Sequence, residues 1–222
     1  MRKIIFTMVS VIMIVGGVAA QDIFFPSKQG MSLVYANLDA KGKVDSYTRQ
    51  TIRNVEGSGN NLSVTYVGQS FDKNRKPVSD LEVPLTVTVN NGVVEWDMKS
   101  FAAPGTEGLI EIEGDKMRLP SNLSPGDKLD DAKFTMTLNM GLKIKTDMTI
   151  TNQQCLAIED VTVPAGTFKC HKVTQTGTAT VMRKTTTTKT ISWYAPGIGT
   201  VKSESYNDKD KLQSSMVLEA IE

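Results

Sequence analysis

Residues 134–151 alternate between apolar and polar side chains along almost their whole length. The even positions are apolar except Thr146, and every odd position is polar or glycine. Because successive side chains of a strand point to opposite faces, the pattern predicts antiparallel β-structure with one apolar and one polar face. The apolar face supplies eight candidate ligand-binding residues: Phe134, Met136, Leu138, Met140, Leu142, Ile144, Met148 and Ile150.

The alternation continues without a change of phase through the tripeptide at 139–141. Any loop there must therefore have an odd number of residues, and a three-residue loop with Gly141 in a left-handed conformation fits. This interpretation places Leu138 opposite Leu142 and Met136 opposite Ile144.

A second hairpin is predicted over residues 85–98. Asn91-Gly92 is the strongest two-residue hairpin signal, and apolar residues alternate on both sides of it. Turn chemistry and hydrophobic pattern select the same register. The predicted pairs are Val89 with Val94, Val87 with Trp96, and Leu85 with Met98.

Short turns rich in Pro and Gly separate the other strand-like runs, and no helical periodicity of useful length follows residue 20. These features predict an all-β fold, a large curved antiparallel sheet in a meander. Sheets of more than about ten strands must curl or split, which favours a half-barrel of about ten to fourteen strands. The least periodic segment, 99–131, is where a break or cover of the sheet is expected. Residues 21–222 are predicted to form a single all-β domain.

Residues 1–20 have the composition of a secretory signal peptide. Two basic residues precede an apolar run, and small residues lead to a predicted cleavage between Ala20 and Gln21. The alternative is a membrane anchor, but the apolar run is shorter than the roughly twenty residues that span a bilayer. We therefore expect an exported protein and favour the periplasm as its location, with the cell surface or secretion as alternatives. No membrane span is expected in the mature chain.

Both cysteines, Cys155 and Cys170, lie in the exported part of the chain. A disulfide between them is expected in an oxidising compartment. The alternative is a pair of buried thiols. A metal site that combines them with His171 is disfavoured, because neighbouring residues of a strand point to opposite faces.

The charge balance argues against a nucleic-acid partner. The net charge is +1, and removal of residues 1–20, which carry two basic and no acidic residues, makes it −1.

The sequence lacks the common motifs of catalytic nucleophiles, phosphate-binding loops, dinucleotide-binding folds and zinc proteases. It has a single histidine, so any histidine-based catalytic triad would have to be built around that residue. The sequence therefore predicts no enzymatic activity, no cofactor and no metal.

Two functions remain as hypotheses. The methionines of the 134–150 face suit a surface that binds a lipophilic, for example acyl, ligand, although the same face could be ordinary core. The polar run at 183–190 is typical of an edge strand, which could accept another protein by strand addition.

Two motifs carry a family resemblance. One is VTVPAGTFKC at 161–170, and the other is WYAPGIGTVKSE at 193–204. With the segment at 119–129, they resemble an uncharacterised exported family of Gram-negative bacteria, often labelled TapB-like, and a broader related domain of unknown function. The resemblance implies a half-barrel similar to the lipoprotein carriers LolA and LolB, which hold acyl chains on the concave face. The TapB name implies an envelope partner with tetratricopeptide repeats, which is the alternative function. Pro and Gly set the turn angles in both motifs, so the motifs themselves indicate architecture.

Overall fold

The computed structural model describes residues 23–222, apart from 80–81, 102–107 and 140. The predicted signal peptide, the bond between Ala20 and Gln21, and Met140 therefore lie outside the described residues.

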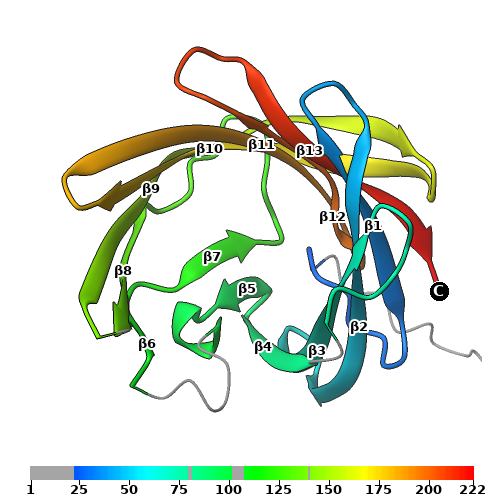
Figure 1. The fold of residues 1–222 in the computed structure, drawn as a ribbon. Coiled ribbons are helices and arrows are strands. Elements are labelled where there is room, and N and C mark those ends of the chain that lie inside the picture. Colours follow the sequence, from blue (N-terminus) through cyan, green and yellow to red (C-terminus); the bar gives the residue numbers. More distant parts are fainter. Residues whose placement is uncertain (1–22, 80–81, 102–107, 140) are drawn as a thin grey trace, which may run out of the picture.

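Thirteen strands form one antiparallel sheet that is strongly curved and not closed (Figure 1). A short 3-10 helix at Met98–Phe101 follows β5, and the strand order is β6-β8-β9-β10-β11-β12-β13-β1-β2-β3-β4-β5-β7. The predicted fold class is confirmed. The strands are Ser32–Asp39 (β1), Val44–Ser58 (β2), Asn61–Asp72 (β3), Val83–Asn90 (β4), Val93–Trp96 (β5), Ile110–Gly114 (β6), Met117–Pro120 (β7), Ala132–Asn139 (β8), Lys143–Val163 (β9), Gly166–Val181 (β10), Lys184–Ala195 (β11), Gly199–Tyr206 (β12) and Leu212–Ile221 (β13).

The two edges of the sheet lie in the segment expected to interrupt it. The edge strands β6 and β7 are consecutive in sequence, and only Asp115 and Lys116 separate them. Asp115 still follows the β8 side, where its N–H donates to the carbonyl of Lys133 at 2.8 Å. Lys116 already reaches the opposite edge, where its ammonium pairs with Glu95 at 3.1 Å. The chain thus crosses from one edge to the other within two residues.

The hairpin of β4 and β5 has the predicted register. Val89 pairs with Val94 and Val87 with Trp96. Asn91 and Gly92 both have positive φ, 51° and 79°, as a two-residue primed turn requires. The expected pair of Leu85 with Met98 is wrong, because β5 ends at Trp96 and the chain turns into the 3-10 helix.

The hairpin of β8 and β9 has the predicted loop length but another register. Asn139 pairs with Lys143, so the three-residue loop runs over 140–142, and Gly141 has a φ of 78°. Leu138 faces Ile144 and Met136 faces Thr146, so the predicted partners Leu142 and Ile144 were wrong. The register differs by two residues, and a shift of two leaves every side chain on its predicted face.

All of the polar run at 183–190 except Arg183, which lies in the preceding turn, belongs to β11. This strand lies inside the sheet but has a free edge over part of its length. β10 pairs with β11 from Lys184 onward, whereas β12 joins only at Lys189. The segment 184–188 therefore projects beyond β12. No backbone hydrogen bond reaches it from that side in the part of the chain that the structure describes.

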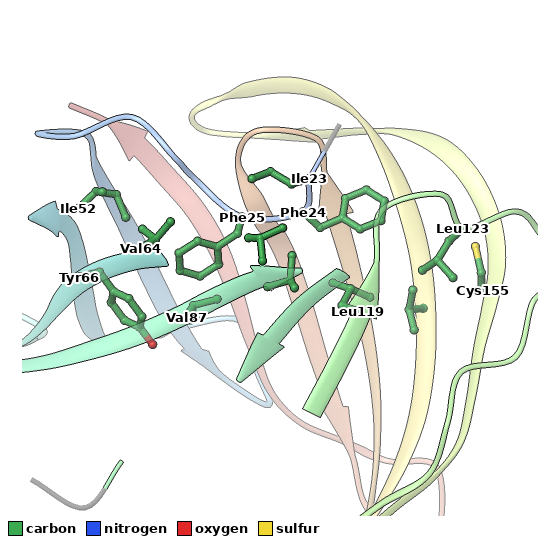
Figure 2. Close-up of a cluster of buried hydrophobic side chains, with 13 residues drawn as sticks. Ile23, Phe24, Phe25, Ile52, Val64, Tyr66, Val87, Leu119, Leu123 and Cys155 are labelled. Carbon is green, nitrogen blue, oxygen red and sulfur yellow. The ribbon is translucent and has the colours of Figure 1, made fainter. Parts of the chain in front are cut away.

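The segment that precedes β1 fills the inside of the curved sheet. Ile23 and Phe24 are 1% exposed and Phe25 is 5% exposed, although they belong to no strand. Figure 2 shows Phe24 and Phe25 surrounded by side chains from strands far apart in the sheet. We call this the inner cluster; it contains Ile23, Phe24, Phe25, Ile52, Val64, Tyr66, Val87, Val89, Val94, Leu119, Leu123, Cys155 and Val173.

Aromatic contacts fix this segment in place. The Phe25 ring lies 5.6 Å from the Tyr66 ring and 6.3 Å from the Trp96 ring, measured between centroids. Burial raises the pKa of Tyr66 to about 12. The carbonyl of Ile23 accepts the N–H of Gly197 at 2.8 Å, which ties the segment to the turn between β11 and β12. We call the sheet face toward this segment the inner face.

The opposite, outer face carries a second cluster that joins the two sequence motifs. The turn of the β9–β10 hairpin lies against β13, where the N–H of Ala165 donates to the carbonyl of Leu218 at 3.3 Å. Side chains of 161–170 thereby pack against those of 193–201. The buried members of this outer cluster are Leu33, Tyr35, Val163, Cys170, Trp193, Ala195, Val201 and Leu218.

The expected disulfide is not present in this structure, which has two buried free thiols. Cys155 pairs with Val173 in the ladder, whereas Cys170 pairs with Glu159. Cys155 belongs to the inner cluster and Cys170 to the outer cluster. The two thiols therefore point to opposite sides of the sheet, which a disulfide cannot bridge without moving the backbone.

We expect Phe24→Ala to lower the free energy of unfolding by about 3 to 5 kcal/mol, as removal of a fully buried aromatic side chain does. Denaturant unfolding of residues 21–222 measures the change. Val78→Ala is the control, because Val78 is 68% exposed and should leave the midpoint unchanged. A loss below about 1 kcal/mol for Phe24→Ala would show that the segment is not part of the cooperative core.

We expect both thiols to react with iodoacetamide only after unfolding. Burial, with the charges of Asp160 and Glu159, raises the pKa of Cys170 to about 11, and burial raises that of Cys155. Few thiolates are therefore available in the folded state at neutral pH. Mass spectrometry of protein unfolded without reductant should show two labels per chain. A mass lower by two hydrogen atoms with no label would instead establish the disulfide.

Candidate functional site

The face predicted from the 134–151 alternation is the inner face of the sheet. β10 pairs with β11 without a register shift from His171 to Val181, so its odd residues share one face. Val173, a member of the inner cluster, lies on that face. Gly177 and Ala179, four and six residues further along the strand, share this face and pair with Ile150 and Met148. The predicted residues therefore continue the face that holds the N-terminal segment.

The structure brings the predicted residues together on two paired strands, β8 and β9. Phe134 pairs with Met148, Met136 with Thr146, and Leu138 with Ile144, between β8 and β9. On the other side of β8, the edge strand β6 adds two isoleucines to the same face: Ile110 opposite Leu138, and Ile112 opposite Met136. Because directly paired residues share a face, these side chains form one continuous apolar surface.

Exposure of this surface increases toward the β8–β9 loop. Phe134 is 8% exposed, whereas Leu142 in the loop is 64% exposed. The other described candidates are half-buried: Met136, Leu138, Ile144, Met148 and Ile150. These half-buried apolar side chains on neighbouring strands form a partly exposed apolar surface.

A hollow of about 210 Å³ lies on this surface. Small residues of β10 face the larger ones of β9, since Gly177 lies opposite Ile150 and Ala179 opposite Met148. Ligand pockets commonly reach about 300 Å³ or more, so the hollow is smaller than a typical complete ligand pocket. It is lined by Phe134, Met148, Thr149, Ile150, Gly177, Thr178, Ala179, Thr186 and Thr188.

The contribution of β10 and β11 was missed in the sequence. The signal was present, because Gly177 and Ala179 interrupt a threonine-rich run at alternate positions. Small residues at a spacing of two mark a strip of one strand face that lacks bulk. The partner strand could not be assigned, because nothing in 134–151 specifies that β10 lies beside it.

A charged cluster lies at the other edge of the sheet. The Glu95 side chain is 8% exposed; it accepts hydrogen bonds from the Arg118 guanidinium at 2.9 Å and from the Asn90 amide at 2.8 Å. The Lys116 ammonium completes the group. Burial opposes ionisation of Glu95, but the hydrogen bonds from Lys116 and Asn90 outweigh it and keep its pKa below the usual range. The ion pairs hold β7 against β5, and we assign them a structural role.

The single histidine of the sequence lies on the inner face of β10. His171 is half-buried, and its ring centroid lies 4.8 Å from that of Phe24. Its ring therefore packs against the N-terminal segment. The described part of the chain has no helix that is long and apolar enough to cross a bilayer.

Two solved structures have this architecture. A "putative exported protein with YmcC-like fold" from Bacteroides fragilis NCTC 9343 is 25% identical, with a TM-score of 0.72 over 90% of this chain and 99% of that one. A "putative lipoprotein" from Parabacteroides distasonis ATCC 8503 is 24% identical, with a TM-score of 0.74 over 90% of this chain and 98% of that one. No curated protein matches the chain.

The family is established by a match over most of the sequence. Residues 28–218 match the DUF3108-like family, and this range includes both motifs and the whole 134–151 face. The match agrees with the resemblance to a domain of unknown function. The TapB name and the relation to LolA and LolB remain predictions. The chain belongs to the DUF3108-like family.

Proposed function

We propose that this protein binds a lipophilic ligand, an acyl chain in the first place, on the inner face of β8, β9 and β10. The half-buried apolar surface next to the hollow is the observation that carries the proposal. Two of its side chains, Met136 and Met148, are flexible thioethers that adapt to irregular apolar shapes. The ligand would cover apolar area that is otherwise in contact with water.

We further propose that the protein works in the periplasm and without catalysis. Its structural relatives are described as an exported protein and a lipoprotein, which supports export. The candidate surface contains no charged side chain among its lining residues, so it offers apolar contact rather than acid–base chemistry. A binding role needs only contact and exclusion of water.

We expect Met148→Asp to abolish binding of the ligand. A carboxylate in the centre of the surface would have to lose its hydration when an apolar chain covers it. Native mass spectrometry of residues 21–222, purified from the periplasm without detergent, should show a lipid adduct on the wild type and none on the variant.

Thr137→Asp is the matched control. It adds the same charge on β8, but on the outer face, since Thr137 lies between Met136 and Leu138 in the alternation. The control should retain the adduct. A bare wild-type mass together with no binding of hydrophobic dyes would refute the proposal.

A second candidate function rests on the free edge of β11. Residues 184–187 are exposed and extend past the end of β12. Every second residue of this segment directs its N–H and C=O away from β10, where an added strand could pair with them. An envelope protein, for example one with tetratricopeptide repeats, could bind there.

Two proline substitutions test the free edge. At Thr185 and Thr186, consecutive N–H groups point to opposite sides of the strand, so one proline removes a hydrogen bond to β10 and the other only a free donor. We expect the variant that loses the hydrogen bond to β10 to melt at a lower temperature. The variant that loses only the free donor should keep its stability but lose its partner in cross-linked envelope pulldowns. Unchanged capture by both variants would eliminate this candidate.

A further inference from the structure

Three large apolar side chains are exposed at one end of the sheet. Leu142 in the β8–β9 loop is 64% exposed, and Met182 in the β10–β11 turn is 67% exposed. Leu109, immediately before β6, is 50% exposed. Single exposed apolar residues are common on protein surfaces, but a group on adjacent loops indicates a contact surface.

The pairing of the strands places these three residues at the same end. The N–H of Asn139, at the end of β8, donates to the carbonyl of Leu109 at 2.8 Å. Asn139 also pairs with Lys143, at the start of β9. β9 in turn pairs with β10 through Thr146 and Val181, directly before Met182. The loop and the turn therefore project from neighbouring strands, as the left side of Figure 1 shows.

Basic residues follow two of the three apolar ones, Leu142 and Met182, in the chain. Lys143, Lys145, Arg183 and Lys184 are all exposed. Lys145 pairs with Asp147 at 3.3 Å. Within the described residues, the other three make no ion pair, and the segments 142–145 and 181–184 contain no acidic residue. Glu111 is also nearby and accepts a hydrogen bond from the Asn139 amide at 3.3 Å. Basic residues therefore outnumber the acidic ones here, Glu111 and Asp147, although residues 21–222 together have a net charge of −1.

The β12–β13 turn is exposed as well but has a different distribution of charges. The β12–β13 turn also exposes two lysines, Lys209 and Lys211. Asp208 and Asp210 alternate with them, and Asp210 pairs with Lys189 at 3.2 Å. This turn carries no exposed large apolar side chain. An excess of basic residues together with exposed apolar residues is therefore a property of the first end and not of every hairpin.

We propose that this end of the sheet docks on an anionic lipid bilayer. Lysine and arginine are attracted to anionic headgroups, and the leucines and methionine can enter the interface between headgroups and acyl chains. The proposed surface, which we call the basic tip, consists of Leu109, Leu142, Lys143, Met182, Arg183 and Lys184.

A bilayer suits this arrangement because the apolar residues stand on separate loops rather than lining one groove. The inner face runs toward the same end through Leu138 and Ile144, so docking would bring its exposed part to the membrane. Docking of the basic tip on a membrane does not require a ligand on the inner face.

Flotation of residues 21–222 with lipid vesicles tests the inference. We expect binding to vesicles of phosphatidylcholine with about one third phosphatidylglycerol, little binding to phosphatidylcholine alone, and weaker binding at high salt, where the attraction is screened. R183E/K184E should weaken binding at least tenfold, since each basic residue contributes roughly fivefold. L142D/M182D should abolish it.

K209E/K211E is the matched control, because it reverses the same number of charges in another exposed turn. It should retain binding to within about twofold, as a site outside the contact would. The inference is overturned if the wild type does not float, if it binds neutral and anionic vesicles equally, or if the control loses as much binding as R183E/K184E. Circular dichroism verifies that each variant is folded.

The two proposals fail in different experiments. A tip variant that keeps its lipid adduct in native mass spectrometry but no longer floats separates docking from ligand binding. Met148→Asp should behave in the opposite way, with flotation kept and the adduct lost, since Met148 lies on the inner face away from the loops.

Discussion

The curvature of the sheet depends on the contacts that residues 23–26 make with its concave inner face. A curved sheet of thirteen strands has a concave face that must be filled, and this segment supplies two phenylalanines to that face. The Phe25 ring lies against Tyr66 of β3 and Trp96 of β5. The Phe24 ring lies against His171 of β10 and Tyr194 of β11, so strands far apart in the sheet share one core. Without that filling, the same strands would have to flatten or approach one another more closely.

One sheet carries two cores because alternate residues of the same strands face opposite sides. On β10, Val173 points to the inner cluster and Cys170 to the outer one. The outer cluster needs a cover, which the β9–β10 hairpin provides by lying back against β13. The two proline-glycine motifs meet there, with Phe168 from one motif and Trp193 from the other. Their role in this structure is to close that second core.

The alternation of apolar and polar residues predicted the sheet face of each side chain more reliably than it predicted which residue lies opposite on the next strand. The β8–β9 register differed from the expected one by two residues, yet each side chain kept its face, because strand parity is unchanged by an even shift. The turn at Asn91-Gly92 fixed its hairpin directly, since only a few residues accept two positive φ angles. Ile23 and Phe24 have no periodic pattern, so their place in the core could not be predicted. The opposite orientations of Cys155 and Cys170 depend on register shifts in β9, which the sequence does not specify.

The same turn chemistry explains why the sheet stays open. If β6 and β7 formed a hairpin, their pairing would close the barrel, and Asp115 and Lys116 would have to occupy its turn. A two-residue primed turn needs positive φ at its first position, and Asp115 does not have a positive φ. Gly114 instead has a φ of 131°, and a Cβ there would lie 2.3 Å from the carbonyl oxygen of Lys133. Only glycine allows this close approach to β8, after which Lys116 pairs with Glu95 at the far edge. The two edges are thus tied by the chain but not by a ladder, which is why the curved sheet is not a closed barrel.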